Sequence, residues 1–542
     1  MRRFSCKTRR GRGPRVAVSL RSVVLGLWLV SAGLAQTITT VVGTGALGSA
    51  GDGGQATAAT LNNPVSLAFG PDGAYYIADQ NAHVIRKVDA NGVITRFAGT
   101  GAGGYNGDNQ PAVNAMLHEP TGVAVDVAGN VYIADAANAR IRKVDTNGAI
   151  TTIAGTGVAG FSGDGPQTAT QAQLQCPVRL AFDGLGDLYV ADQCNHRIRK
   201  IDGSGMMSTV AGTGATGASA GGFNGDGMGA LATQFQHPTS IAIDGLGAIF
   251  VSDQVNQRVR KIDRNGMVST LATRAQAHGS VAVDSAGNVY FSDHQVHRVF
   301  RINGGQPTFT PTLIVGNGTA SSTGDNGPAA NATVNVPFGI TLDPFGNLYI
   351  LESGGHKIRK VADLAPKAPT FSGLGVTNGA SFLSGGIQPG SIATIFGVYL
   401  SNVAGLVTDG GVFPLPTNLG GTTVTVGGFL APLYAVVNND GVGQINLQVP
   451  FQVGFPALPR AQGEEFVEVV VTNNGVSNTP VLVPVTPQLP GIFVLSGFAA
   501  AQHVTTTIPW SRQNARPRVV RLALTVPAWA WCRTRRPRAR KH

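Results

Sequence analysis

Charged residues are scarce in this chain of 542 residues and make up only 13% of it. Acidic residues are missing from both ends: residues 1–35 and 512–542 hold 18 of the 40 Lys and Arg residues and no Asp or Glu. The rest of the chain therefore carries 22 basic residues against 29 acidic ones, a net charge of −7. The overall charge of +11 belongs to the ends, so we expect no nucleic-acid binding by the body of the protein.

Long hydrophobic runs and familiar catalytic motifs are also missing. No stretch after residue 35 is apolar for long enough to cross a membrane, so we expect no transmembrane span in the mature chain. The sequence contains no CxxC pair, no phosphate-binding loop and no Ser-His-Asp order. These absences argue against a redox enzyme, a nucleotide-binding enzyme and a triad hydrolase.

The first 35 residues have the pattern of a secretory signal. Arg-rich residues 1–15 precede an apolar run from Val23 to Val30, and Gly33 and Ala35 occupy the −3 and −1 positions of a cleavage site before Gln36. No cysteine follows that site, which argues against a lipid anchor. We therefore expect a secreted or otherwise extracytoplasmic protein, in the periplasm or outside the cell.

Glycine is abundant, at 74 residues, and the chain repeats itself six times. The copies begin at or near Pro64, Pro120, Pro177, Pro238, His278 and Pro337. Each contains short β-type runs separated by tight-turn residues; in the first copy the runs are Val65–Phe69, Tyr75–Ala78, Val84–Val88 and Ile94–Ala98. Four antiparallel strands in a repeated unit predict the blade of a β-propeller.

The sixth copy lacks its last strand, because it stops at Lys360-Val361. The segment Ile38–Gly45 resembles the fourth strand of the other copies. We therefore expect an all-β, six-bladed propeller in which the N-terminal strand completes the last blade and closes the ring.

The repeat resembles the NHL family, whose signature is a strand that ends in Asp, followed by Asn and then Arg-Ile-x-Lys. Here it occurs as Asp135, Asn138 and Arg140–Lys143 in the second copy, and it recurs along residues 37–362. The fifth copy departs from it, with His294, His297 and Phe300-Arg301, and the sixth has Glu352 in place of Asp. The resemblance implies an NHL-type propeller.

We predict five segments along the chain: the signal peptide 1–35, the propeller 36–363, a linker 364–374, an Ig-like β-sandwich 375–498 and a basic tail 499–542. The sandwich resembles a carboxy-terminal domain found on secreted proteins of soil bacteria. The tail contains Trp510, Trp529 and Trp531 and has no strand or helix period. We expect it to be disordered or to be a frameshifted extension that leaves the sandwich truncated; a genuine basic tail is the alternative.

A ligand site on such a scaffold is expected on the loop-rich rim or at the mouth of the central tunnel. The candidate rim residues follow the second strand of each copy: Asp79, Asn81, Asp135, Asn138, Asp192, Asn195, Asp253, Asn256, Asp293, His294, His297, Glu352 and His356. The repeated Asp and the Arg five residues later are expected to pair with each other or to cap the loop, an architectural role. The surrounding polar groups are candidates for binding a carbohydrate, peptide or protein.

A second repeated element is a Gly-Asp loop between copies, which contains Asp52, Asp108, Asp164, Asp226 or Asp325. One carboxylate per loop is too few for a good calcium site, so we favour turn geometry.

His118, His237 and His278 each lie within two residues of the start of a first strand. They could converge on a zinc ion at the tunnel mouth, and some lyases that act on amidated-peptide precursors resemble this chain in being NHL propellers with a His-bound metal. The three are not at equivalent positions in their copies. We therefore predict a non-catalytic, monomeric binding or scaffold protein without a cofactor, and keep a metal-dependent lyase or hydrolase as the alternative.

Cysteine is scarce, with four residues. Cys176 precedes the first strand of the third copy and Cys194 follows the second, so antiparallel pairing places them side by side. In an oxidising location these two are predicted to form a disulfide. Cys6 and Cys532 lie in the two terminal segments.

Overall fold

The structure is a computed structural model of the whole chain. It describes residues 36–362 apart from 166, 215–220, 274–278 and 305–309, and then residue 364 and short stretches between 376 and 485: 376–378, 391–398, 400–401, 405–408, 415–439, 442–450, 465–473, 476–478 and 480–485. The predicted signal segment, the basic tail and His278 lie outside the described residues.

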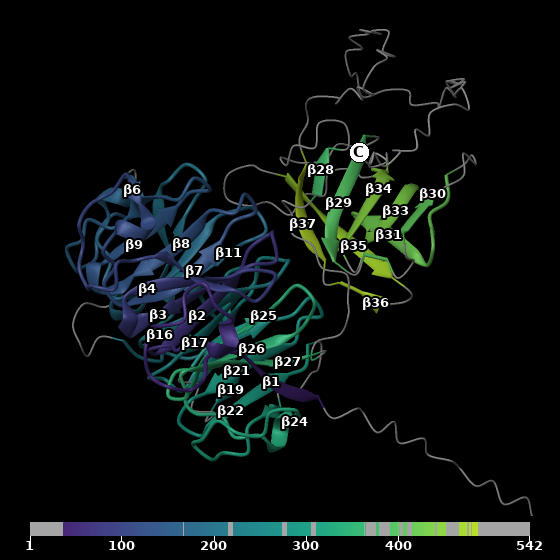
Figure 1. Cartoon of the computed structure of the whole chain (residues 1–542). Helices are drawn as coiled ribbons and strands as arrows, with labels where there is room; N and C mark the ends of the chain where they lie inside the picture. The colour runs from purple at the N-terminus through teal and green to yellow at the C-terminus, as the bar shows by residue number, and fades with distance from the viewer. Residues whose placement is uncertain are drawn as a thin grey trace, which may run out of the picture. The chain divides into compact units, whose positions relative to one another are not determined.

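Residues 36–362 form six antiparallel sheets, one for each sequence copy (Figure 1). The first contains β2 (Pro64–Phe69), β3 (Tyr75–Asp79), β4 (Val84–Val88) and β5 (Ile94–Ala98). The second contains β7 (Pro120–Val125), β8 (Val131–Asp135), β9 (Arg140–Val144) and β10 (Ala149–Ala154). The third contains β11 (Pro177–Phe182), β12 (Leu188–Asp192), β13 (Arg197–Ile201) and β14 (Met207–Ala211).

The remaining three sheets repeat this order. The fourth contains β16 (Pro238–Ile243), β17 (Ile249–Asp253), β18 (Arg258–Ile262) and β19 (Met267–Thr273). The fifth contains β20 (Val281–Val283), β21 (Val289–Asp293), β22 (Arg298–Ile302) and β23 (Thr312–Val315). The sixth contains β25 (Pro337–Leu342), β26 (Leu348–Glu352), β27 (Lys357–Val361) and β1 (Thr37–Val42).

The first strands of the six sheets contact one another in cyclic order. β2 contacts β7, β7 contacts β11, and the series continues through β16, β20 and β25 back to β2. Each sheet is thus packed between two neighbours, which lets both of its faces be buried.

The N-terminal strand β1 completes the sixth sheet, as predicted. It pairs antiparallel with β27, with Ile38 opposite Val361 and Thr40 opposite Arg359. Ile38 is fully buried in the core that the fifth and sixth sheets share.

The outer edges of three sheets are covered by short strands that the sequence did not predict. β6 (Gln110–Pro111) pairs with β10, β15 (Met228–Gly229) with β19, and β24 (Gly327–Pro328) with β1. Each belongs to the loop that precedes its own sheet, so the chain runs along the outer edge of that sheet before it reaches the first strand on the inside of the ring. Covering an exposed edge in this way removes a site of unwanted strand pairing.

Helical structure in the described part of the chain is limited to single turns of 3-10 helix. These are η1 (Ala56–Ala58), η2 (Gln80–Ala82), η3 (Ala112–Asn114), η4 (Ala136–Asn138), η5 (Ala169–Gln171), η6 (Gln193–Asn195), η7 (Ala230–Ala232) and η8 (Ala329–Asn331). None of the described helices has the length and apolar character that crossing a bilayer requires.

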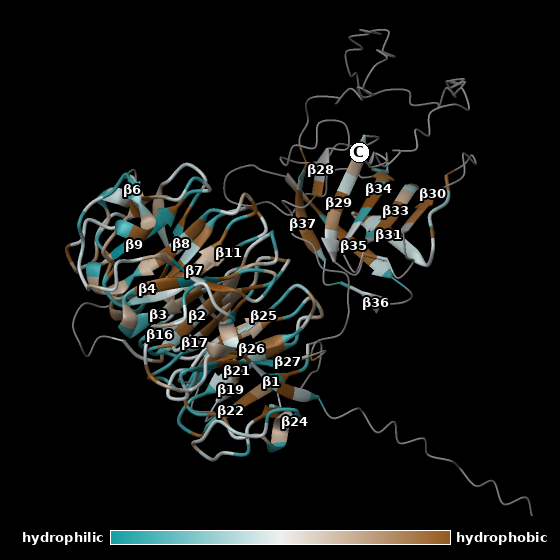
Figure 2. Ribbon diagram, in the orientation of Figure 1, coloured by the Kyte–Doolittle hydropathy of each residue, from teal (hydrophilic) through white to brown (hydrophobic). Residues whose placement is uncertain are grey.

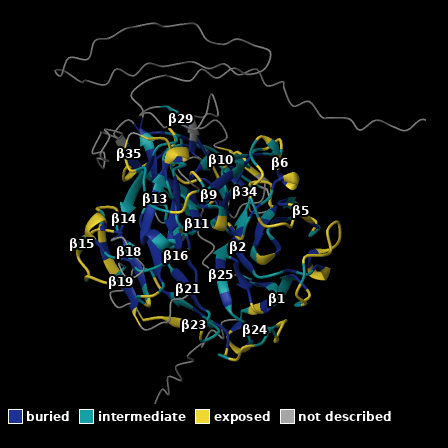
Figure 3. Cartoon of the chain, turned by 90° about the vertical axis from the view of Figure 1, so that its left-hand side faces the viewer, coloured by how far each residue is buried: buried dark blue, intermediate teal, exposed yellow. Residues whose placement is uncertain are grey.

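The core lies between neighbouring sheets. One cluster joins Val65 and Ile85 of the first sheet to Val123 and Ile133 of the second, and the other interfaces are filled in the same way. Hydrophobic residues follow the strands, whereas the loops are more hydrophilic (Figure 2). Figure 3 shows the strands buried and the exposed residues concentrated in the loops.

The described residues beyond 375 form two further antiparallel sheets. One contains β28 (Val376–Asn378), β29 (Ile392–Val398), β34 (Val442–Gln448), β33 (Leu433–Asn439) and β30 (Gly405–Thr408). The other contains β32 (Phe429–Leu430), β31 (Thr422–Val426), β35 (Glu465–Asn473) and β36 (Val476–Ser477), with β37 (Val481–Val485) also paired to β35.

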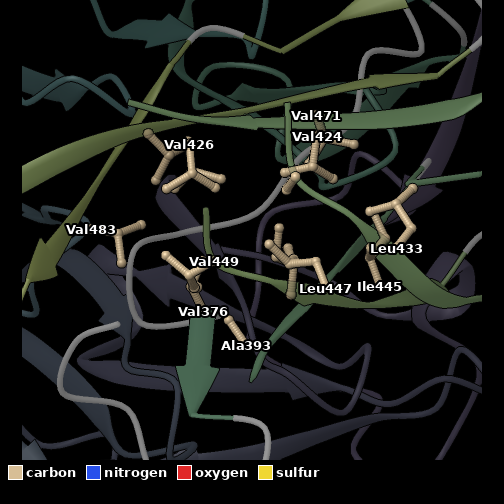
Figure 4. Close-up of a cluster of buried hydrophobic side chains, with 14 of the residues drawn as sticks. Val376, Ala393, Val424, Val426, Leu433, Ile445, Leu447, Val449, Val471 and Val483 are labelled. Atoms are coloured by element: carbon tan, nitrogen blue, oxygen red, sulfur yellow. The ribbon is translucent and has the colours of Figure 1, made fainter. Parts of the chain in front are cut away.

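These two sheets share one hydrophobic core. Ile445 and Leu447 from the first sheet and Val424 and Val471 from the second point toward one another (Figure 4). All four side chains are 0–1% exposed. Alternating buried residues on each strand therefore seal the space between the sheets.

Cys176 and Cys194 are joined by a disulfide, with their Cα atoms 5.5 Å apart. Cys176 stands directly before β11 and Cys194 lies in η6, directly after β12. The bond therefore ties the entrance of the first strand to the end of the second. A loop of this length is expected to stabilise the fold by about 3 kcal/mol.

Removal of residues 37–45 is expected to abolish the cooperative unfolding transition, because β27 would lose its partner strand. The milder Ile38→Ala substitution should lower the free energy of unfolding by about 2–5 kcal/mol. Thr37→Ala, at an exposed position on the same strand, is the matched control and should change it by less than about 0.5 kcal/mol. Thermal and urea unfolding measure these effects, and an unchanged transition in the deletion variant would contradict the pairing of β1 with β27.

Native protein prepared from an oxidising compartment should show no reaction of Cys176 or Cys194 with a maleimide until a reductant is added. Peptide mapping by mass spectrometry after labelling separates these residues from Cys532. Labelling of both thiols without reductant would refute the disulfide.

Candidate functional site

Five arginines lie in the interior of the six-sheet region, at the third position of the third strand in five sheets. They are Arg86, Arg142, Arg199, Arg260 and Arg359, and each is 0% exposed. A buried guanidinium is costly unless carboxylates and hydrogen-bond acceptors compensate its charge. The surroundings of these arginines therefore determine how the loops are arranged.

Each of these arginines contacts two acidic residues. One is the aspartate of the Gly-Asp loop before the sheet, at 2.6–3.1 Å: Asp52, Asp108, Asp164, Asp226 or Asp325. The other is the acid that ends the second strand, at 3.3–4.0 Å: Asp79, Asp135, Asp192, Asp253 or Glu352. We call each set of three an acid–arginine–acid triad.

The triads account for the repeated aspartates of the Gly-Asp loops. In the second sheet, Asp108 accepts a hydrogen bond from Arg142 at 2.8 Å and another from Thr152 of the fourth strand at 3.0 Å. This carboxylate therefore fastens the loop to the sheet, in agreement with the structural role that the sequence favoured over calcium binding.

The pairing predicted for the strand-end acids was wrong in its partner. We expected Asp135 and Arg140, five residues later, to pair with each other or to cap the loop, but the ion pair of Asp135 is with Arg142, seven residues later. Arg140 instead donates to the carbonyl oxygens of Asn138 and Thr156, both at 3.0 Å. Arg197 has the same arrangement in the third sheet, with Asn195 and Thr213.

The acids predicted at the rim are interior residues. Asp79, Asp135, Asp192, Asp253, Asp293 and Glu352 are all 0–1% exposed. Burial raises the pKa of Asp192 to about 6, although Asn195, Gln175 and Arg199 act to lower it. Such carboxyl groups are removed from water, which leaves the neighbouring exposed groups to make any rim site.

The predicted asparagines connect two loops at the rim. Asn138 Nδ2 donates to Asp135 at 2.8 Å and to the carbonyl oxygen of Gly104 at 2.7 Å. Asn195 and Asn256 make the equivalent two contacts in the third and fourth sheets. Asn81 is exposed.

The fifth sheet has no triad among the described residues. Phe300 replaces the buried arginine, and no Gly-Asp loop precedes this sheet in the sequence. Asp293 accepts hydrogen bonds from the backbone of Gln295 and Val296 instead. Because the arginine and its loop aspartate are missing together, the two act as one unit.

The rim of the second to fourth sheets carries aromatic rings that the sequence analysis missed. The guanidinium carbons of Arg140, Arg197 and Arg258 lie 3.5–3.9 Å from the ring centres of Tyr105, Phe161 and Phe223, respectively. The triad arginines of the same sheets lie 4.8–4.9 Å from these rings. The signal was present in the sequence, because each aromatic stands three residues before the loop aspartate.

The histidines lie where neighbouring sheets meet. His118 is stacked edge-on with His83, with ring centres 5.5 Å apart, and His237 with His196 at 4.9 Å. His196 Nδ1 accepts the backbone N–H of His237 at 3.1 Å. Among the described residues no three His, Cys, Asp or Glu side chains gather as metal ligands, and the His118–His237–His278 alternative stays a prediction because His278 is not described.

The other predicted histidines are also placed where sheets meet or packed against rings. His297 Nδ1 accepts the backbone N–H of Val336 at 3.2 Å, which links the fifth sheet to the sixth. His294 lies 5.6 Å from the ring of Phe338, centre to centre. His356, at the end of its turn, has a positive φ of 50° and is half-buried.

The six first strands enclose a cavity of about 480 Å³, which we call the central cavity. Its polar lining includes Ser66, Arg179, Ser240 and Ser280. The lining continues to Phe69 and to the turns that follow the first strand in the fifth and sixth sheets. It includes none of the predicted rim residues. The central cavity and the loop-rich rim are therefore separate candidate sites.

Breaking a triad should destabilise the protein strongly. Arg142→Ala leaves the buried carboxylate of Asp135 and the partly exposed carboxylate of Asp108 without their cation and should cost about 3–5 kcal/mol. Lys87→Ala, which removes the partly exposed ion pair with Asp72, should cost less than about 1 kcal/mol. Urea unfolding of both variants measures the difference, and similar small effects would mean that the triads are not structural.

Comparisons with known proteins agree with this geometry. Residues 45–104 and 100–160 match the Teneurin NHL domain, and residues 174–201 match the NHL repeat. The chain is 30% identical over 241 residues to SUPPRESSOR OF QUENCHING 1 of Arabidopsis thaliana, a match that covers 42% of this chain and 22% of that protein. It is also 30% identical over 236 residues to Teneurin-4 of Mus musculus, covering 40% of this chain and 8% of that protein. The chain thus matches less than a quarter of the length of these relatives.

Two similar solved structures are enzymes. Virginiamycin B lyase from Staphylococcus aureus has a TM-score of 0.36 and 14% identity, covering 55% of this chain and 94% of that one. A gluconolactonase from Xanthomonas campestris has a TM-score of 0.39 and 11% identity, covering 60% and 91%. The family matches, which fall on the first three repeated sheets, identify these units as NHL repeats, and the chain contains an NHL-repeat β-propeller.

Proposed function

We propose that the protein is a secreted, non-catalytic binding or scaffold protein whose loop-rich rim presents a rigid surface to a carbohydrate, peptide or protein ligand. In this proposal the six sheets are the blades of a six-bladed propeller closed by β1, and the two later sheets form an Ig-like module that acts as a spacer or attachment domain. The cyclic contacts of the first strands and the pairing of β1 with β27 support the six-bladed form. The core that the two later sheets share supports the sandwich.

The observation that carries the proposal is the repeated arginine–aromatic stack at the rim. Tyr105 and Phe223 remain 40% and 39% exposed although each ring lies against two arginines. Exposed aromatic rings beside guanidinium groups supply the flat apolar faces and hydrogen-bond donors that sugar rings and peptides bind. Val158 and Val255, 59% and 47% exposed, add apolar surface to nearby loops of the same rim.

The rings are held in place before any ligand arrives. Tyr105 lies over Arg140, which is itself fixed by two carbonyl oxygens, and over the buried Arg142 of the triad. A side chain that is already ordered loses little conformational entropy on binding, so more of the contact energy appears as affinity. A rigid rim of this kind is suited to recognition.

An extracytoplasmic location is part of the proposal. The Cys176–Cys194 bond supports it, because such bonds persist in oxidising compartments. The apolar run behind an Arg-rich start, at residues 1–35, is the second support.

The test uses a glycan array and a displayed peptide library as probes for the full chain. Ligands selected by the wild-type protein should bind the Tyr105→Ala/Phe223→Ala variant at least tenfold more weakly. Val127→Ala is the matched control, because Val127 is 60% exposed in the turn between β7 and β8, at the opposite rim. Its affinity should be unchanged.

Two outcomes contradict the proposal. Ligands that bind the double variant normally but fail to bind the Val127 variant would place the site on the opposite rim. A stoichiometric transition metal in the purified protein would favour the lyase or hydrolase alternative.

A further inference from the structure

One arginine in the NHL-repeat region differs from all the others in its position. The third residue of the first strand is small in four copies, namely Ser66, Gly122, Ser240 and Gly339, and the equivalent position of the fifth copy is Ser280, directly before β20. In the third copy this position is Arg179, in β11. Its side chain belongs to the lining of the central cavity.

Arg179 is buried without a counter-charge. It is only 8% exposed, yet its guanidinium makes no hydrogen bond or ion pair with any residue that the structure describes. The five triad arginines, which are equally buried, each contact two carboxylates. Burial lowers the pKa of Arg179 to about 10, so the group is still charged at neutral pH. Burying a cation without a counter-charge costs free energy, so a bound anion at this position would stabilise the folded protein.

The guanidinium reaches across the cavity toward the sixth sheet. A Cβ atom placed on Gly339 of β25 would lie 3.3 Å from Arg179 Nη2. β11 and β25 are not neighbours in the cycle of first strands, because two strands lie between them in either direction. The absence of a side chain at Gly339 leaves room for the guanidinium at the centre of the cavity.

The carboxylates that line the cavity are already used by their own turns. Asp343 accepts hydrogen bonds from the backbone of Phe345 and Asn347 and from Asn347 Nδ2, at 2.6–2.9 Å. Asp284 accepts four equivalent hydrogen bonds, from Ala286, Asn288 and Tyr290. Neither forms an ion pair with Arg179 in the described structure, and their charges disfavour a ligand with more than one negative charge.

The rest of the lining sets the chemical class of the ligand. Aliphatic side chains such as Leu67 and Ile340 contribute apolar surface, and the hydroxyl groups of Ser66, Ser240 and Ser280 already hydrogen-bond to neighbouring first strands. A single planar guanidinium can donate two parallel hydrogen bonds to a carboxylate, and the apolar wall around it suits a carboxylate that carries an apolar group.

We propose that the central cavity binds a small organic carboxylate, whose two oxygens accept hydrogen bonds from Arg179. The cavity volume of about 480 Å³ is within the range of small-molecule sites. The lining extends toward the turns between first and second strands, at the rim opposite the arginine–aromatic stacks, so this site is independent of the proposed rim function.

The test compares the full-length wild-type protein with Arg179→Ser, which installs the residue found at the equivalent positions of the first, fourth and fifth sheets. Thermal unfolding and calorimetric titration are measured with potassium acetate, lactate and benzoate, against chloride and phosphate at equal ionic strength. At saturation at least one carboxylate should raise the Tm of the wild-type protein by about 2 °C or more. Arg179→Ser should bind it at least tenfold more weakly and show no such shift.

The stability of the unliganded variants is a second readout. Because Arg179 has no described partner, Arg179→Ser should unfold at the wild-type temperature or above it, whereas Arg142→Ser should unfold at a much lower temperature. Failure of Arg179→Ser to fold would reveal a structural partner and overturn the proposal. So would equal carboxylate effects on both proteins, a response to phosphate alone, or no response of the wild-type protein to any carboxylate.

Discussion

The buried guanidinium group is the constraint on which most of the six-sheet region depends. A buried arginine is costly unless carboxylates compensate its charge, so each triad draws a distant loop and a strand end to the same point. Arg142 thereby joins Asp108, from the loop before its sheet, to Asp135 at the end of β8. A buried ion pair of this kind adds little net stability compared with apolar packing, but it permits only one arrangement of the loops. The same arginine lies under Tyr105, so the interaction that organises the repeat also shapes the surface of the rim.

The two candidate sites both depend on buried arginines, which are neutralised by acids at the rim and unpaired in the central cavity. At the rim, acids neutralise the buried arginines, and what faces the solvent is a row of rings and carbonyl-bound guanidinium groups. In the central cavity, Arg179 has kept its charge without a partner among the described residues. The cavity has room for one arginine side chain because the other five copies have serine or glycine at that position. The repeats thus provide the framework, and the single arginine at this position of the third copy provides a candidate group for binding an anion.

Much of the repeat architecture could be predicted from the sequence. The strands of the first copy were located to within one residue, because Asp-Gly and Asn-Gly turns mark their ends, and β1 was assigned through its likeness to the fourth strands. The partner of Asp135 was not predictable, because Arg140 and Arg142 lie on the same strand and only the folded loop around Asp108 selects between them. The histidine stacks were missed for a related reason: His83 and His118 meet only where two sheets join. Arg179 was visible in the sequence, but its lack of a partner is a property of the folded cavity.

The position of β1 has a consequence for the order of events during folding. Ile38, near the start of the described chain, is paired with Val361, near the end of the repeats. Individual hairpins can form as soon as their residues have been synthesised, but the last contact joins segments separated by the whole set of repeats. Such a contact has a high entropic cost of loop closure and comes late in folding. Until then β27 presents a free edge. A chain released before its final repeat would lack β27, and its own β1 would be free to pair with the β27 edge of another copy.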